Sequence, residues 1–174
     1  MPKDILEIGK KDLEYYLQDI DTENKFFSDS AYAILEESWL LGEGYKSYRK
    51  WLNLGGLGKW KNNWDCDNLA VSFKLYLQML HAKHNPYTFT DRWKKKVENM
   101  TNVESVAVGV VYYKIEREGS SSMHAINLAF CPSGFGLSAT GNFHTLKRLY
   151  IEPEDGTVKE LTEKEEASIW YANF

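Results

Sequence analysis

The chain has 174 residues, of which 43% are apolar, and a formal net charge of −4. This length and composition can bury one sizeable core, so the sequence predicts a single domain over residues 1–174. An acidic chain lacks the overall basic surface of a nucleic-acid-binding protein, and no apolar stretch is long enough to span a membrane. We therefore expect neither nucleic acid nor membrane as a partner.

The first residues are charged and do not resemble a signal peptide. Cys66 and Cys131 are the only cysteines, which is too few for a disulfide scaffold. These features favour a cytoplasmic protein with reduced thiols. His81 and His84 are close in sequence, but Cys66 lies about four helical turns away, so we expect no zinc site and no cofactor.

The N-terminal part of the chain has helical patterns. Apolar residues predict an amphipathic helix over 4–20, broken near Gly9, and a second helix from Ser28 or Asp29 to Leu40. A third helix is expected over 45–54, and a short basic helix is expected to begin at Thr90 or Asp91 and run through Trp93 and Val97.

The most apolar helix is expected to begin at Asp65 and Cys66 and to end near His84. It is apolar on most sides, which is typical of a helix buried inside a domain. Cys66 would lie in its first turn, where the helix dipole lowers the pKa of a thiol and favours the thiolate.

After residue 102 the pattern changes to strands. Alternating residues predict a strand from Val106 to Ile115, a second over Met123 to Phe130 and a third over Leu146 to Ile151. Thr162 and Glu165 match a capping box, which predicts a final helix through Trp170. Helices followed by consecutive strands indicate an α+β fold.

Three residues have the chemistry of a cysteine nucleophile and its partners. Cys66 supplies the thiolate, His124 can take and return the proton, and Glu152 can orient the imidazole from the end of the next strand. Asn142 is the runner-up for the orienting role. Asn127 is a poorer choice because strand alternation points it away from His124, although it could hold a strand end or a substrate loop.

Three motifs carry a family resemblance. Asp65-Cys66-Asp67-Asn68-Leu69-Ala70, His124-Ala125-Ile126-Asn127 and Tyr150-Ile151-Glu152-Pro153 together resemble the papain-like, transglutaminase-like cysteine peptidase superfamily, and especially its small bacterial and phage members. The resemblance implies a Cys-bearing helix packed on an antiparallel sheet, with Cys66, His124 and Glu152 as the catalytic triad.

The sequence departs from the papain pattern in two respects. No glutamine stands between Gly55 and Cys66, and the third residue is a glutamate instead of asparagine or aspartate. Asn62, Asn63 or Trp64 could replace the glutamine as oxyanion donor, together with the Cys66 backbone N–H.

The resemblance implies a cysteine protease, an amidase or a transglutaminase-like enzyme. Such a hydrolase or acyl transferase would act on an amide or isopeptide bond of a peptide, protein or peptidoglycan-type substrate. One alternative is a papain-like fold without activity that serves as a binding or structural protein, for example in a phage or secretion assembly. Another is a deamidase or transglutaminase-type effector that modifies a partner protein.

Each candidate residue also has a structural interpretation. Cys66 could be a buried structural thiol or form a disulfide with Cys131, His124 could be a hydrogen-bonded strand residue, and Glu152 could be a solvated strand end. The runs Lys59-Trp60-Lys61 and Trp93-Lys94-Lys95-Lys96 are more typical of a solvated face than of a nucleic-acid site. Trp51, Trp60 and Trp64 could pack in the core or line a groove for a peptide or glycan.

Overall fold

The structure is a computed structural model that describes residues 6–20, 22, 24–84, 105–117, 120–138 and 141–174. The predicted basic helix that begins at Thr90 or Asp91 lies outside the described residues. In chain order the elements are β1 (Leu6–Gly9), α1 (Lys10–Tyr15), β2 (Lys25–Phe26), β3 (Ala31–Ile34), α2 (Glu37–Trp39), the π-helix η1 (Leu40–Gly44), α3 (Tyr45–Leu54), α4 (Cys66–His84), β4 (Ser105–Val106), β5 (Val108–Arg117), β6 (Ser120–Ser138), β7 (Gly141–Ile151), β8 (Val158–Lys159), α6 (Glu163–Glu166) and β9 (Tyr171–Asn173).

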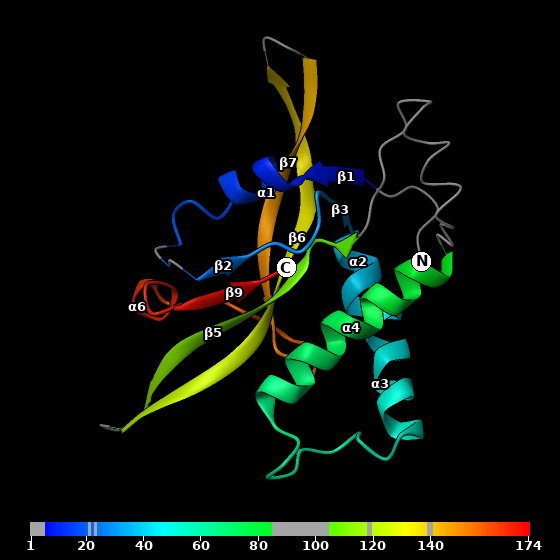
Figure 1. The fold of residues 1–174 in the computed structure, drawn as a ribbon, viewed down its shortest axis with the longest axis vertical. Coiled ribbons are helices and arrows are strands. Elements are labelled where there is room, and N and C mark those ends of the chain that lie inside the picture. Colours follow the sequence, from blue (N-terminus) through cyan, green and yellow to red (C-terminus); the bar gives the residue numbers. More distant parts are fainter. Residues whose placement is uncertain (1–5, 21, 23, 85–104, 118–119, 139–140) are drawn as a thin grey trace.

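The described strands form two sheets. The smaller sheet has the order β1-β3-β4, and the larger has the order β2-β9-β5-β6-β7-β8. The long strands β5, β6 and β7 pair antiparallel in the middle of the larger sheet. Figure 1 shows these strands as a twisted ribbon, with α3 and α4 side by side along one side of it.

Strand alternation divides the core between the two faces of the larger sheet. Val108 and Ala129 pack with buried residues of α3 and α4 on one face. Val111 and Ile126 pack on the other face, with residues of α1, β1, β3 and β9. No helix in the described ranges is both long enough and apolar enough to cross a membrane.

The first two predicted N-terminal helices are wrong over most of their length, and the third, over 45–54, is confirmed as α3 (Tyr45–Leu54). Residues 6–9 are a strand, and only Lys10–Tyr15 is helical after Gly9. The second predicted helix is replaced by β3, in which Tyr32, Ala33 and Ile34 are all buried. Burial of consecutive residues requires both faces of the segment to be covered, which suits an inner strand and conflicts with an amphipathic helix.

The predicted C-terminal helix is also corrected. The capping box of Thr162 and Glu165 is present and opens α6, but this helix ends at Glu166. The chain then turns towards the sheet, where the Trp170 N–H donates to the Tyr112 carbonyl (3.1 Å) and β9 pairs with β5. Burial of Ile169 and Ala172 against the sheet outweighs the local helical pattern.

These differences correct the predicted α+β class with a papain-like or transglutaminase-like core. The described chain is mostly β-sheet, and its N- and C-terminal segments add strands where the prediction placed helices. The helix that begins at Cys66 and the antiparallel strands after residue 105 are present, and α4 packs on β6.

The β7–β8 turn depends on a glycine. Gly156 has φ +78°, and an added Cβ would lie 2.6 Å from the Tyr45 ring. We expect Gly156→Ala to lower the free energy of unfolding by at least about 1–2 kcal/mol, because a side chain is disfavoured in the left-handed region. Thermal unfolding followed by circular dichroism measures the effect. Gly42→Ala is the control, since nothing lies within 4 Å of its added Cβ, and equal melting temperatures for the two variants would contradict the expectation.

Candidate functional site

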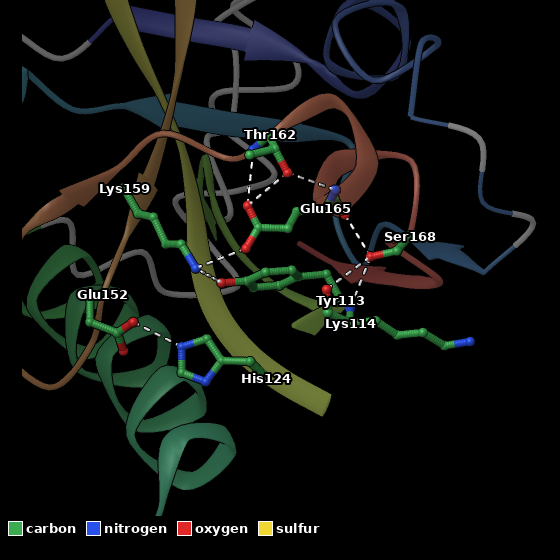
Figure 2. Close-up of polar contacts among 8 residues, drawn as sticks. All are labelled: Tyr113, Lys114, His124, Glu152, Lys159, Thr162, Glu165 and Ser168. Carbon is green, nitrogen blue, oxygen red and sulfur yellow. Dashed lines mark hydrogen bonds and ion pairs between the residues drawn. The ribbon is translucent and has the colours of Figure 1, made fainter. Parts of the chain in front are cut away.

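The site lies where strand β6 loses its neighbour. β7 pairs with β6 only as far as Ile151, which is opposite Asn127, so the edge of β6 at His124 is not covered by β7. The chain continues from Ile151 directly into Glu152, whose side chain reaches back to His124 across this edge (Figure 2). The point at which β7 ends therefore provides the space for the site.

His124 and Glu152 are hydrogen-bonded as the sequence predicted they could be. His124 Nε2 lies 2.8 Å from Glu152 Oε2, and both side chains are only about one-fifth exposed, at 19% and 21%. The β7–β8 turn fixes the Glu152 backbone, because its N–H donates to the Thr157 carbonyl and its carbonyl accepts from the Gly156 N–H, each at 2.8 Å. The bond to Nε2 leaves Nδ1 as the ring nitrogen available to a third group.

Cys66 is the third group. It is the first residue of α4 and is half-buried. The His124 ring and the Ala125 backbone N–H interact with its thiol and lower the pKa of the thiol. The structure thus brings Cys66, His124 and Glu152 into one connected set.

The hydrogen bonds change the charges of this set. The bond from His124 lowers the pKa of Cys66, against the effect of burial. Burial disfavours the charged form of His124, but its bonds to Cys66 and Glu152 outweigh burial and raise its pKa from 6.5 to about 9. A lowered thiol pKa beside a raised imidazole pKa favours a thiolate–imidazolium pair near neutral pH.

The arrangement has the parts of an activated nucleophile. Cys66 lies at the N-terminus of a helix of 19 residues, the His124 imidazole interacts with its thiol, and Glu152 hydrogen bonds to the imidazole. Asp67 follows Cys66 in the first turn of α4, and a hydrogen bond from Asp67 raises the pKa of Asp65. The polar groups around the thiol therefore include two neighbouring carboxyls.

The three predicted oxyanion donors differ in exposure: Asn62 and Asn63 are exposed, whereas Trp64 packs against the core. Asn62 and Asn63 are exposed in a tight turn, which is closed by reciprocal backbone bonds of 2.9 Å between Lys61 and Trp64. The Trp64 side chain packs against the core that contains α3 and α4, and its buried Nε1 has no hydrogen-bond partner among the described atoms. The two asparagines are exposed in the loop that leads to Cys66, as are Lys59 and Lys61.

Asn127 has a structural role in the described chain. It is fully buried, and its Nδ2 donates to the Ala70 carbonyl (2.8 Å) and to the Gly109 carbonyl (3.2 Å). It therefore ties α4 to the sheet. Asn142 lies in β7, opposite Leu137, and is not in the loop that the sequence predicted.

The sequence analysis missed two aromatic neighbours of the triad. Tyr112 and Cys66 pack against the same small cluster of buried residues on one face of β5, and the Tyr113 ring stands edge-on to the His124 ring on the other, with centroids 5.7 Å apart. The alternation of the predicted strand could have placed these side chains on opposite faces, but it could not show which residue of β6 stands opposite each of them. Register is set by pairing across strands, and sequence alternation alone does not fix it.

The second cysteine is separate from the site. Cys131 is buried in the core, both cysteines are free, and burial raises the pKa of the Cys131 thiol to about 12. Within the described ranges, no group of three or more His, Cys, Asp or Glu side chains is arranged to hold a metal ion.

Comparisons with known proteins give a likeness in fold. No protein-family model and no curated protein matches the chain. A solved complex of PSL1a, the Polyporus squamosus lectin, with E64 matches with a TM-score of 0.50 and 17% identity over 97% of this chain. A complex of Polyporus squamosus lectin with the human-type influenza-binding epitope Neu5Aca2-6Galb1-4GlcNAc has a TM-score of 0.49 and 18% identity over 97% of the chain.

The chain spans about half of the lectin chains that it matches, with coverage of 51% and 50% of their lengths. At this level of identity the likeness to PSL1a is a likeness of fold, and fold does not transfer function from one protein to another.

These findings correct the family assignment made from the sequence. The solved structure that matches with a TM-score of 0.50 is a complex of the lectin PSL1a, and no protein-family model matches. The assignment to the papain-like, transglutaminase-like superfamily depended on three short motifs, and a Cys-His-acid constellation recurs on unrelated folds. Short motifs of this kind describe a local arrangement and do not identify a family.

The predicted activity is corrected together with the family. Cysteine peptidase, amidase or transglutaminase activity, and the peptide, protein or peptidoglycan-type substrate, were implied by the superfamily, and lectin structures stand where peptidases were expected. The geometry of Cys66, His124 and Glu152 is independent of these corrections.

The first prediction concerns the two thiols. We expect iodoacetamide at pH 7 to alkylate Cys66 at least about tenfold faster than Cys131, because the thiolate is the reactive form and Cys131 is buried with a raised pKa. Mass spectrometry of the two cysteine peptides over time measures both rates. The control is the same reaction in denaturant, where the rates should converge, and faster labelling of Cys131 in the folded chain would contradict the assignment.

The second prediction concerns stability and pH. The pKa of His124 is raised from 6.5 to about 9, so its stabilising effect is fully present below pH 6.5 and is lost as the pH rises through about 9. We expect His124→Gln to lower the melting temperature more at pH 6 than at pH 10, as measured by differential scanning calorimetry. A difference between variant and unmodified chain that is the same at both pH values would contradict the ion pair.

Proposed function

We propose that the chain is a carbohydrate-binding protein whose ligand lies on an exposed run of aromatic side chains beside Cys66. This is a binding function, and it matches the alternative that the sequence left open, without a phage or secretion assembly as its setting. The aromatic run is the observation that carries the proposal.

The aromatic run consists of Phe26, Tyr112, Trp170 and Tyr171. The Tyr112 ring centroid lies 5.7 Å from that of Trp170 and 5.5 Å from that of Tyr171, and Tyr171 lies 5.4 Å from Phe26. Phe26 and Trp170 are 52% and 47% exposed, although aromatic side chains of this size usually gain most by burial. A contiguous exposed aromatic surface is typical of a binding site.

A hollow continues the aromatic run. It has a volume of about 620 Å³, and its lining includes Trp170, Met123, Asn24 and Lys114. Met123 precedes His124 on β6 and stands opposite Lys114 on β5, which places the hollow beside the triad along the same pair of strands. The hollow thus combines exposed apolar surface with a few polar groups, as ligand sites do.

This combination fits the chemistry of a sugar. A pyranose ring has a face of C–H groups that can lie on an aromatic ring and a rim of hydroxyl groups that need hydrogen-bond partners. Trp170 offers the aromatic face, and the side chains of Asn24, Thr22 and Ser168 line the same hollow. A purely apolar ligand would leave these polar groups without partners.

The triad lies at one end of the aromatic run. Tyr112 and Cys66 pack against the same small cluster of buried residues, so a ligand that extends beyond Tyr112 would approach Cys66 and His124. In this proposal Cys66, His124 and Glu152 provide the polar contacts at that end, and the exposed Asn62 and Asn63 are candidates for further contacts.

The comparisons support the ligand class only indirectly. The fold is like that of about half of the PSL1a lectin chain, and that half is not identified as the sugar-binding part. We propose residues 1–174 as one binding domain and the reducing cytosol as its setting, because both cysteines are free.

The test is direct binding of sugars. Isothermal titration with Neu5Aca2-6Galb1-4GlcNAc and with its components galactose and N-acetylglucosamine should give saturable binding. We expect Trp170→Ala to weaken the binding at least about tenfold, or by about 1.4 kcal/mol, because the stacking surface is lost. Trp60→Ala is the matched control, since Trp60 is equally exposed (52%) but lies in the loop before α4, outside the aromatic run.

Two outcomes would contradict the proposal. One is the absence of binding across the sugar panel by the unmodified chain. The other is release of product from an amide substrate in a reaction that Cys66→Ala abolishes, which would show that the triad turns its ligand over.

A further inference from the structure

The position of Glu152 depends on a short hairpin. Glu152 follows the last residue of β7, and β8 returns as a strand of only two residues, Val158 and Lys159, at the edge of the larger sheet. The two strands share only the register pairs Tyr150↔Lys159 and Ile151↔Val158. An edge strand this short has few backbone bonds to hold it, so side-chain contacts have a large part in fixing the hairpin.

Lys159 makes these contacts. Its Nζ donates to the Tyr113 hydroxyl at 2.5 Å and to Glu165 Oε1 at 3.3 Å. Tyr113 is fully buried in β5, in the middle of the sheet. Glu165 is itself held, because its Oε2 accepts from the Thr162 N–H at 3.0 Å within the capping box. Lys159 therefore ties the hairpin to two segments that are already fixed.

Lys159 and Glu152 contact two residues that are paired across β5 and β6, Tyr113 and His124. Tyr113 and His124 are directly opposite each other in the register of β5 and β6, with ring centroids 5.7 Å apart. Lys159 binds Tyr113, Glu152 binds His124, and both belong to the hairpin (Figure 2). Two hydrogen bonds and one ring contact thus form a closed circuit of contacts. Tyr113 accepts from Lys159 of the hairpin, Glu152 of the hairpin bonds to His124, and the His124 ring contacts the Tyr113 ring.

We infer that Lys159 is the positioning residue of the triad, which holds the β7–β8 hairpin so that the Glu152 carboxylate meets His124. This goes beyond the proposed carbohydrate binding and does not depend on the identity of the ligand.

The charged groups around His124 indicate that Lys159 acts on it by positioning Glu152 and not through its own charge. The groups that face its ring are the Cys66 thiol from α4, the Glu152 carboxylate from the end of β7 and the Tyr113 ring from β5. The groups that raise the pKa of His124 are Cys66 and Glu152. The Lys159 ammonium is directed to Tyr113 and Glu165, so its removal acts on His124 by moving Glu152.

The pH profile of Cys66 alkylation tests the inference. In Lys159→Met, the hairpin loses its anchor, Glu152 binds His124 less well, and the imidazolium that stabilises the thiolate is weakened. We expect the rising limb of the iodoacetamide rate to move up by about half to one pH unit, which lowers the rate on that limb about three- to tenfold. Lys159→Arg keeps a cation at the same place and should restore much of the profile.

Lys164→Met is the matched control. It removes the same charge from a side chain that is 75% exposed and is paired with Glu116, away from the hairpin. We expect its profile to be that of the unmodified chain. If Lys159→Met lowers the melting temperature but leaves the pH profile unchanged, the role of Lys159 is only structural and the inference is overturned.

Tyr113→Phe provides a second test if Lys159→Met does not fold. It removes the hydroxyl that accepts from Lys159 and leaves Glu165 as the remaining partner of the ammonium. We expect a shift in the same direction and of smaller size. An unchanged profile in Tyr113→Phe would contradict the circuit in the same way.

Discussion

The hydrogen bond between His124 and Glu152 joins the parts of the molecule on which the site depends. It spans 2.8 Å between two strands that are no longer paired at this point, since β7 stops opposite Asn127. The imidazole that Glu152 holds also interacts with the Cys66 thiol at the start of α4. One side-chain bond thus connects the sheet, the hairpin after β7 and the longest described helix. Together with Cys66, and against the effect of burial, this bond raises the pKa of His124, and His124 in turn lowers the pKa of the Cys66 thiol.

The local chemistry and the overall fold give different kinds of information about function. The triad shows that the protein can present a thiolate near neutral pH, and the same set of side chains occurs on many unrelated folds. The likeness to half of a lectin chain describes how the backbone is arranged and does not locate a sugar. The aromatic run is more informative than either observation, because exposed aromatic rings beside a polar site indicate a ligand with both apolar and polar groups. A carbohydrate has this character, and Cys66 packs against the same buried cluster as Tyr112 of the aromatic run.

The sequence predicted the parts of the fold that local patterns determine. The helix that begins at Cys66 and the strands that carry His124 and end before Glu152 follow from periodicity and from the proline after Glu152. The N-terminal strand β3 could not be predicted in this way, because periodicity does not separate a short, fully buried strand from a segment of a buried helix. The short α6 shows the same limit at the other end, since its capping box is correct but the packing of Ile169 ends the helix early. Tyr113, Lys159 and the aromatic run were missed because they come together only through strand register and through contacts between distant segments.

The buried amide of Asn127 has a consequence for the mechanics of the protein. Its Nδ2 donates to the carbonyl of Ala70, four residues beyond Cys66, and to that of Gly109 in the sheet. If α4 slid along the sheet by one helical turn, this amide would lose its acceptor in an interior without water, at a cost of about 1–3 kcal/mol. Asn127 therefore acts as a stop that fixes the axial position of the helix. Because this buried hydrogen bond fixes the position of α4 on the sheet, it also fixes the position of the Cys66 sulfur at the start of the helix. A ligand that binds on the outer surface would therefore leave the sulfur in place.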